Sequence, residues 1–367
     1  MKDVLVVKKS KAFQGEIDVP GDKSISHRAF ILASIAKGTS VIRGAQKGKD
    51  CLSTLGCMRK LGVEIEEEDE SFVVKGAGFG GLREPSDVLD CQNSGTTMRI
   101  ISGVLAAQNF YSVLTGDSSL RRRPMQRIIE PLSQMGAKIW SRKGGYPPLS
   151  IKGGSLRGIR YILPVASAQV KSSILLASLH AEGETELEEP HLSRNHTEIM
   201  LKYMGAKIRI KGKKIQISGP QELEAREFKV PGDISSAAFF IGGASILEGS
   251  CVMVNNVGVN PTRAAFLKIL QKMGAQIEVK NERIECGEKV ADVQVRGTGH
   301  LKGVKISGDV IPQVIDEVPI LAVVACFAEG ETIIEGAREL RVKETDRIKA
   351  LVTELSKMGA CIKEMED

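Results

Sequence analysis

The chain carries several short polar motifs that could bind phosphate or carboxylate groups, and the first is PGDKSISHR at residues 20–28. Pro-Gly makes a turn, and Asp22 or Ser24 can cap the helix that follows. Free N–H groups at that helix start, with Lys23 and Arg28 nearby, would form an anion site. A capped surface helix with two solvated cations is the alternative, and this motif alone does not decide between them.

Three further motifs place small polar residues at the expected start of a helix: Asn93-Ser94-Gly95, Ser167-Ala168-Gln169 and Ser193-Arg194. Gly95 would let a ligand approach the backbone closely, although ordinary helix capping also accounts for each motif. A fifth motif, RRR at residues 121–123, precedes Pro124. At most one or two of these arginines could converge on a ligand, and a solvated basic run is the alternative.

Two motifs near the end of the chain could supply acid and base groups. Asp316 precedes an apolar helix expected over residues 320–328, where it either complements the helix dipole or acts as a base at a cleft. In the RVKETDR motif, Lys343 and Arg347 are expected on one face of a helix, where like charges repel. An anionic ligand would offset this repulsion, and so would Glu344 and Asp346.

The elements that position these motifs repeat along the chain. A helix end, a glycine and a short strand recur five times, with glycines at 62, 136, 205, 274 and 359. Gly274 shows the logic, because it supplies the left-handed turn that ends a helix. Each unit reads as two helices with several short strands, which cannot bury its faces alone. If the units stack in parallel, their helix starts converge between two domains.

A second self-match predicts the domain plan. VPGDKS at residues 19–24 is echoed by VPGDIS at residues 230–235, so the chain is expected to cross between domains twice. We expect a discontinuous domain of residues 1–19 and 231–367 with two units, and a continuous domain of residues 20–230 with three. Only eight residues follow Gly359, so a sixth unit is expected to be missing.

The bulk composition favours an α/β (α+β) protein of two domains that binds small anions. The 367 residues are 42% hydrophobic, and Lys plus Arg exceed Asp plus Glu by 51 to 45. The seven cysteines form no CxxC pair, which favours a reducing cytoplasm over a disulfide framework or zinc site. No apolar run is long enough for a membrane span, and aromatic residues for stacking nucleic acid are scarce.

In this order, the motifs resemble the 5-enolpyruvylshikimate-3-phosphate synthase family across essentially the whole chain. The resemblance implies two similar domains of βαβαββ units, with shikimate 3-phosphate and phosphoenolpyruvate bound between them and no metal or organic cofactor. It implies a shikimate 3-phosphate site formed by Lys23, Ser24, Arg28, Ser167, Ala168, Gln169, Ser193, Arg194, Asp316 and Lys343. It implies a phosphoenolpyruvate site formed by Lys23, Asn93, Gly95, Arg123, Gln169 and Arg347.

The resemblance also assigns the chemistry. Asp316 would take the proton of the 5-hydroxyl, and Glu344 with Lys23 would handle proton transfer at the enol methylene. Ala168 stands where many relatives have serine, which removes one hydroxyl contact. The expected missing unit carries phosphoenolpyruvate contacts in the family, so shikimate 3-phosphate binding is expected to survive better than turnover. Gly95, which has no side chain, predicts sensitivity to glyphosate, and a monomer is expected.

Three alternative functions follow from the same residues. An enolpyruvyl transferase acting on UDP-N-acetylglucosamine shares the repeat fold, but it should have a Lys-Asn pair and a reactive loop cysteine. Here Ser24 follows Lys23, and no cysteine lies at residues 121–123. The other two alternatives are a non-catalytic phosphate-binding module and a general polyanion binder.

Overall fold

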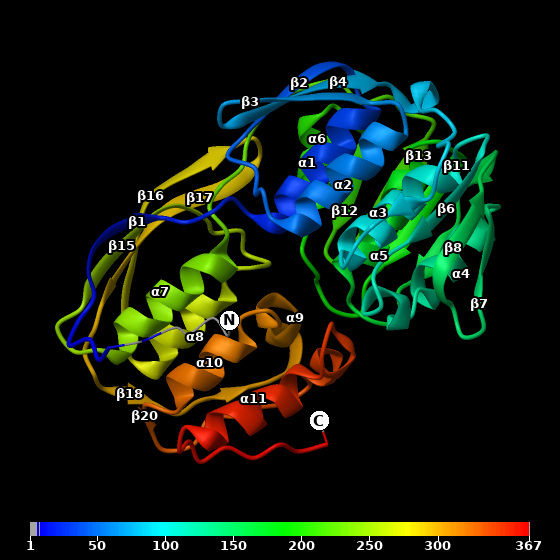
Figure 1. Ribbon diagram of the computed structural model, residues 1–367. Helices are drawn as coiled ribbons and strands as arrows, with labels where there is room; N and C mark the ends of the chain where they lie inside the picture. The colour runs from blue at the N-terminus through cyan, green and yellow to red at the C-terminus, as the bar shows by residue number, and fades with distance from the viewer. Residues whose placement is uncertain (1–5, 7, 367) are drawn as a thin grey trace.

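The computed structural model describes residue 6 and residues 8–366, which form helices and small mixed sheets (Figure 1). Four sheets share one topology. An edge strand pairs in parallel with its neighbour, and that neighbour and the next two strands pair antiparallel with one another. In the second sheet, for example, β5 (Leu89–Asp90) runs parallel to β6 (Tyr111–Thr115), which pairs antiparallel with β8 (Tyr146–Lys152). The repeated βαβαββ unit predicted from the sequence is therefore present.

Three of these units form one half of the molecule, called here the α1–α6 half. Its helices are α1 (Lys23–Ile35), α2 (Lys49–Lys60), α3 (Gly95–Ala106), α4 (Gln126–Met135), α5 (Ala168–Ser178) and α6 (His196–Tyr203). Its remaining strands are β2 (Lys37–Arg43), β3 (Glu64–Glu68), β4 (Ser71–Ala77), β7 (Lys138–Arg142), β9 (Leu156–Arg157), β10 (Arg160–Ile162), β11 (Ala181–Glu188), β12 (Ile208–Lys211), β13 (Lys214–Gly219) and β14 (Glu227–Lys229).

The other half, called here the α7–α11 half, contains the fourth unit and part of a fifth. Its helices are α7 (Ile234–Ile246), α8 (Ala265–Met273), α9 (Ile311–Val314), α10 (Val318–Ala325) and α11 (Arg347–Lys357), with a 3-10 turn η4 (Arg338–Val342). Its strands are β1 (Gln14–Asp18), β15 (Cys251–Gly258), β16 (Gln276–Glu285), β17 (Glu288–Arg296), β18 (Leu301–Lys302), β19 (Lys305–Ile306), β20 (Ala328–Glu329) and β21 (Ile333–Ile334).

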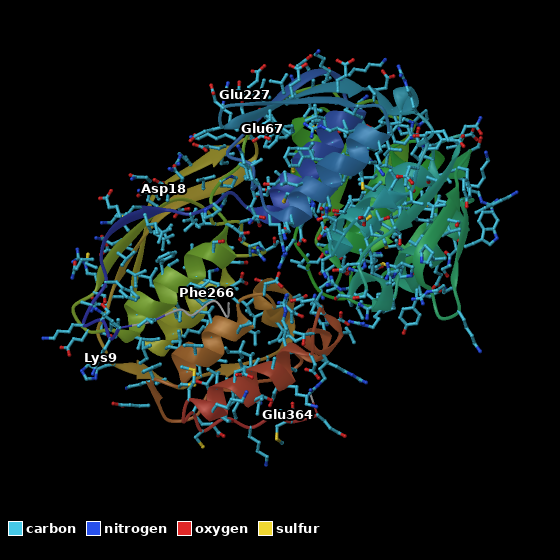
Figure 2. All side chains as sticks on the ribbon, viewed as in Figure 1. Lys9, Asp18, Glu67, Glu227, Phe266 and Glu364 are labelled. Atoms are coloured by element: carbon cyan, nitrogen blue, oxygen red, sulfur yellow. The ribbon has the colours of Figure 1, made fainter. Side chains whose placement is uncertain are left out.

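Each half takes its parallel edge strand from a distant part of the chain. β1 comes from the start of the chain but pairs in parallel with β15, and Figure 1 shows it in dark blue beside the yellow strands of the α7–α11 half. β14 comes from mid-chain but pairs in parallel with β2. Figure 2 accordingly labels Asp18 on the sheet of one half and Glu227 on the sheet of the other.

Two backbone segments therefore cross between the halves side by side. Gly21 and Gly232 form an antiparallel bridge, the Asp22 N–H donates to the Pro231 carbonyl at 2.8 Å, and the Asp233 N–H donates to the Pro20 carbonyl at 2.9 Å. A Cβ on Gly21 would lie 1.9 Å from the Gly44 carbonyl oxygen, so the close approach requires glycine. The repeated VPGD motif is thus the paired crossing predicted from the sequence.

The apolar interior forms two clusters, one from Ile25 to Val230 and one from Ile234 to Leu340. Figure 2 labels Phe266, a fully buried member of the second cluster, in the helical layer of its half. The clusters change over between Val230 and Ile234. On this ground we propose residues 20–230, and residues 1–19 with 231–367, as the two domains.

The five repeat glycines end their helices as predicted, with φ values from +90° at Gly62 to +118° at Gly136. The fifth repeat departs from the prediction, because no strand follows Gly359 among the described residues to 366. A strand needs a neighbour to pair its N–H and C=O groups, and no described segment pairs with residues 360–366. The fifth unit instead contains two separate short strand pairs, β18–β20 and β19–β21.

Candidate active site

The predicted site residues lie mainly at or just before helix starts that face the junction of the two halves. Lys23, Gly95 and Arg347 are the first residues of α1, α3 and α11, and Ser167 caps α5 by accepting from the Val170 N–H at 3.4 Å. Helix starts present free N–H groups and the positive end of the helix dipole. The junction therefore suits anions.

Arg194 and Asp316 meet across this junction. One guanidinium nitrogen of Arg194 forms an ion pair with Asp316 Oδ2, and the other donates to Ser24 Oγ at 3.2 Å. Arg347 Nη1 donates to the second carboxylate oxygen, Oδ1, at 3.1 Å, and Arg263 Nη1 lies 3.6 Å from Oδ2. Three guanidinium groups thus surround one carboxylate.

These cations set the charge state of Asp316. Burial alone would raise its pKa, but the attraction of Arg194, Arg263 and Lys343 outweighs burial and holds the pKa well below its ordinary value of 3.8. Asp316 is therefore a carboxylate at neutral pH, which is the form required of a base.

Lys343 and Glu344 lie beside this carboxylate, although not as the sequence predicted. α11 starts at Arg347 with Asp346 as its cap, and Lys343 precedes the helix in an extended conformation. Lys343 and Arg347 therefore do not share a helix face at i, i+4, and both approach Asp316 instead. Burial lowers the pKa of Lys343 despite Asp316. Glu344 Oε1 accepts from Arg347 Nε at 2.8 Å and from Nη2 at 2.6 Å.

The residues predicted for phosphoenolpyruvate form a second group around the start of α3. Arg123 Nη2 donates to Asn93 Oδ1 at 2.6 Å. Gln169 is held at both ends of its amide, accepting from Arg99 Nη1 at 2.7 Å and donating to Thr96 Oγ1 at 2.8 Å.

The two groups face each other across the same junction. Burial opposes ionisation of Glu344, but hydrogen bonding, the attraction of Arg347 and, last, the attraction of Arg123 from the other half lower its pKa. Arg127 and Glu339 join the halves nearby through two parallel hydrogen bonds of 3.0 and 2.9 Å.

Three predicted residues have roles in the structure that the sequence did not reveal. Arg28 is buried and donates to Thr197 Oγ1, Ser172 Oγ and the Ser24 carbonyl at 2.7–2.9 Å, so it ties three helices together. Ser193 is also buried and donates to Glu189. Lys23 is half-exposed and pairs with Asp50 at 3.3 Å.

The helix expected over residues 320–328 is α10, which both starts and ends earlier, at Val318 and Ala325. Asp316 precedes the helix as expected, and its position follows from its arginine partners. Arg263, Arg99 and the Arg127–Glu339 pair were missed. The only available signal for Arg263 was the Asn260-Pro-Thr-Arg motif before α8, which resembles the other polar helix starts.

An open cavity of about 770 Å³ borders the residues predicted to bind phosphoenolpyruvate. Asn93 lines it, together with Asp50, Asp117 and Arg121, while the other predicted residues lie at the junction itself. Among the described residues, no cluster of His, Cys, Asp or Glu is arranged as a metal site. Within the same part of the chain, no helix has the length and apolar character needed to cross a bilayer.

Comparison with known proteins gives one consistent result. Residues 7–367 match the family described as EPSP synthase (3-phosphoshikimate 1-carboxyvinyltransferase). The chain is 52% identical over 361 residues to the 3-phosphoshikimate 1-carboxyvinyltransferase of Geotalea daltonii, covering 98% of this chain and 84% of that protein. The enzyme of the same name from Brevibacillus brevis is 50% identical over 365 residues, covering 99% and 85%. A solved EPSP synthase from Acinetobacter baumannii superimposes with a TM-score of 0.88 at 49% identity, covering 98% of this chain and 81% of that one.

Proposed function

Because this chain belongs to the EPSP synthase (3-phosphoshikimate 1-carboxyvinyltransferase) family, we infer that its junction binds shikimate 3-phosphate and phosphoenolpyruvate. The enzyme transfers the enolpyruvyl group of phosphoenolpyruvate to the 5-hydroxyl of shikimate 3-phosphate and releases phosphate. The resemblance read from the sequence is confirmed at the level of family, fold and reaction. The transferase acting on UDP-N-acetylglucosamine and the non-catalytic module are not favoured.

We propose that the phosphate of shikimate 3-phosphate binds where α1, α5 and α6 begin. Ser24, Ser167 and Ser193 supply hydroxyl groups there, and Arg194 supplies the main cation. Gln169 and the Ala168 backbone border the same helix start. Lys343 and Asp316 are assigned to the hydroxyl groups of the ring. Arg28 supports the site, because it is buried and three of its five N–H donors bond to Thr197, Ser172 and Ser24.

Phosphoenolpyruvate is assigned to the second group. Arg123 and Arg347 provide guanidinium groups from opposite halves, and such groups bind carboxylate and phosphate with two parallel hydrogen bonds. Asn93 orients Arg123, and Gly95 leaves room for the ligand at the backbone. Lys23 reaches this space when it leaves Asp50, with which it forms only a half-exposed pair.

The reaction is an addition followed by an elimination. Asp316 takes the 5-hydroxyl proton as the oxygen attacks, and Glu344 with Lys23 handles proton transfer at the methylene carbon, giving a tetrahedral ketal phosphate. Removal of a methyl proton and departure of phosphate then restore the enol ether. The surrounding cations offset the repulsion of the two substrates and hold them in line.

The observation that best supports this assignment is the contact of Arg194 with both Ser24 and Asp316, which brings a phosphate-binding cation beside a candidate base. The test measures phosphate release from phosphoenolpyruvate with shikimate 3-phosphate or UDP-N-acetylglucosamine as acceptor. Release with shikimate 3-phosphate alone is expected. Release only with the nucleotide sugar, or with neither acceptor, would contradict the proposal.

We further propose that the enzyme is a monomer of the cytoplasm. The monomer is supported by the fact that one chain supplies the residues assigned to both substrates. Support for the cytoplasm is that all seven cysteines are free thiols, three of them buried. Sedimentation at micromolar concentration tests the first proposal.

A further inference from the structure

A buried lysine underlies the segment that carries Ser193 and Arg194. This segment, residues 189–195, connects β11 to α6. Lys171 lies in the first turns of α5, directly behind the segment, and its side chain is only 1% exposed. Lysine is seldom buried to this extent unless it is paired.

The Lys171 ammonium contacts three acceptors, one for each of its hydrogens. It lies 2.8 Å from Glu189 Oε2, 2.7 Å from Glu198 Oε1 and 3.5 Å from the Ser193 carbonyl oxygen. These contacts fall at the start of the segment, just beyond its end, and in its middle. One side chain therefore fixes the whole connection.

The two carboxylates extend the network toward the substrate residues. Glu189 Oε1 accepts the hydroxyl hydrogen of Ser193, so its two oxygens link Lys171 to that serine. Glu198 follows Thr197, whose hydroxyl accepts from Arg28 Nε at 2.7 Å. Lys171 and Arg28 together balance the charges of Glu189 and Glu198, and all four side chains are buried.

Stability alone does not account for such a network. A well-packed apolar cluster of similar volume is usually at least as stabilising as buried ion pairs, because the charges lose their hydration. A charged network does, however, specify one geometry, since each partner has a fixed direction.

We propose that Lys171 is a positioning residue for shikimate 3-phosphate binding. Through Glu189, Glu198 and the Ser193 carbonyl, it holds segment 189–195 in the one conformation that presents Ser193 and Arg194 to the phosphate. This inference rests on the proposed function of those two residues, and it adds a residue that does not itself touch the substrate.

The test is a double-mutant cycle on the full chain, with shikimate 3-phosphate affinity measured by calorimetry. Lys171→Met keeps the length of the side chain and removes its charge. Because small displacements of positioning groups are costly, we expect its dissociation constant to rise roughly tenfold or more. Arg194→Gln should weaken binding as well. In the Arg194→Gln background, Lys171→Met should have much less effect, since there is no longer a guanidinium to position.

Lys214→Met is the matched control, because Lys214 pairs with Glu188 next to Glu189 but is half-exposed and outside the network. It should leave affinity unchanged. If Lys171→Met does not fold, Glu189→Gln takes its place, because it keeps Lys171 paired with Glu198.

The outcomes separate the two ideas. Unchanged affinity in Lys171→Met would overturn the positioning role. So would an equal fold-change in the dissociation constant in the wild-type and Arg194→Gln backgrounds, because a purely structural effect is independent of Arg194. Unchanged affinity in Arg194→Gln would instead overturn the proposed phosphate site. In turnover assays, positioning predicts a raised KM for shikimate 3-phosphate with little change in the KM for phosphoenolpyruvate.

Discussion

Arg194 and Asp316 are 122 residues apart in the chain and form an ion pair across the junction of the two halves. The pair joins the proposed phosphate-binding cation to the proposed base. A substrate phosphate must therefore compete with Asp316 for the Arg194 guanidinium. Release of Arg194 also removes one of the attractions that depress the pKa of Asp316, so phosphate binding would make the carboxylate a stronger base.

This competition makes a prediction for Asp316→Asn. The neutral amide no longer holds Arg194, so shikimate 3-phosphate should bind at least as tightly as in the wild type. Turnover should nevertheless fall by about 10²–10⁴-fold, the usual contribution of a general base. Calorimetry and phosphate release measure the two effects. Asp87→Asn is the control, because it breaks an exposed ion pair with Lys60 that lies within one half and outside the site. Binding weakened tenfold in Asp316→Asn would contradict the competition.

The Arg127–Glu339 pair is predicted to favour the closed arrangement of the halves. Both side chains are about 40% exposed, so the pair is worth roughly 0.2–1 kcal/mol. Arg127→Gln or Glu339→Gln should therefore weaken shikimate 3-phosphate binding by up to about fivefold, with little further loss in the double variant. Arg160→Gln, which breaks an exposed pair within one sheet, is the control. If the losses of affinity in the two single variants add fully in the double variant, the pair does not favour the closed arrangement.

His27 predicts a loss of stability in weak acid. Its ring is fully buried against Thr54, and burial, with repulsion by Lys23 and Arg28 and only partial compensation from Asp22, lowers its pKa from 6.5 to about 3. Between these values the unfolded chain binds a proton that the folded chain does not, so stability falls as the pH drops below 6.5.

At pH 5 this difference amounts to about 2 kcal/mol. His27→Gln should remove it, so urea titrations at pH 7 and pH 5 should show a smaller loss for the variant than for the wild type. Equal losses in the two proteins would show that His27 does not carry this pH dependence.

Two Gly→Ala substitutions, one at the crossing between the halves and one in a helix, are predicted to change stability in opposite directions. In Gly21→Ala the new Cβ would lie 1.9 Å from the Gly44 carbonyl oxygen, which is backbone and cannot turn away. We expect a loss of at least roughly 1–3 kcal/mol in the free energy of unfolding. Gly56, in α2, has open space at its Cβ position, so Gly56→Ala should gain about 0.5–1 kcal/mol. Thermal or urea unfolding measures both, and a tolerated Gly21→Ala would contradict the close approach.

The sequence was sufficient to predict the repeats and the paired crossing, because each depends on local rules. A glycine that follows an amphipathic stripe readily adopts the positive φ that ends a helix, and the VPGD motif occurs twice in the chain. The domain plan likewise placed residues 1–19 in the half that contains β15. The strand-by-strand pairings of β1 with β15 and of β14 with β2 were not predictable, because they are decided by contacts between distant segments.

The site was predictable only where a motif was specific. Asp316, Lys343 and Arg347 were predicted through their motifs and the structure brings them together. The predicted helix face for Lys343 and Arg347 was wrong, since α11 starts at Arg347. Arg263 and Lys171 were not found, because a buried cation cannot be told from a solvated one without its partners. Their roles follow from carboxylates contributed by other segments.

Gly95 carries the last prediction, which concerns glyphosate. A Cβ at this position would lie 2.8 Å from Arg99 Nη1 and 3.4 Å from Arg123 Nη1, so an alanine would narrow the space beside both guanidinium groups. Glyphosate is longer than phosphoenolpyruvate, so its affinity should fall more than that of the substrate. We expect the wild-type enzyme to be inhibited, and Gly95→Ala to raise the inhibition constant by roughly tenfold or more relative to the KM for phosphoenolpyruvate. Gly154→Ala, with open space at its Cβ, should change neither constant. Wild-type activity that persists at millimolar glyphosate, or an equal loss of affinity for substrate and inhibitor in Gly95→Ala, would show that this glycine does not set the length of ligand accepted.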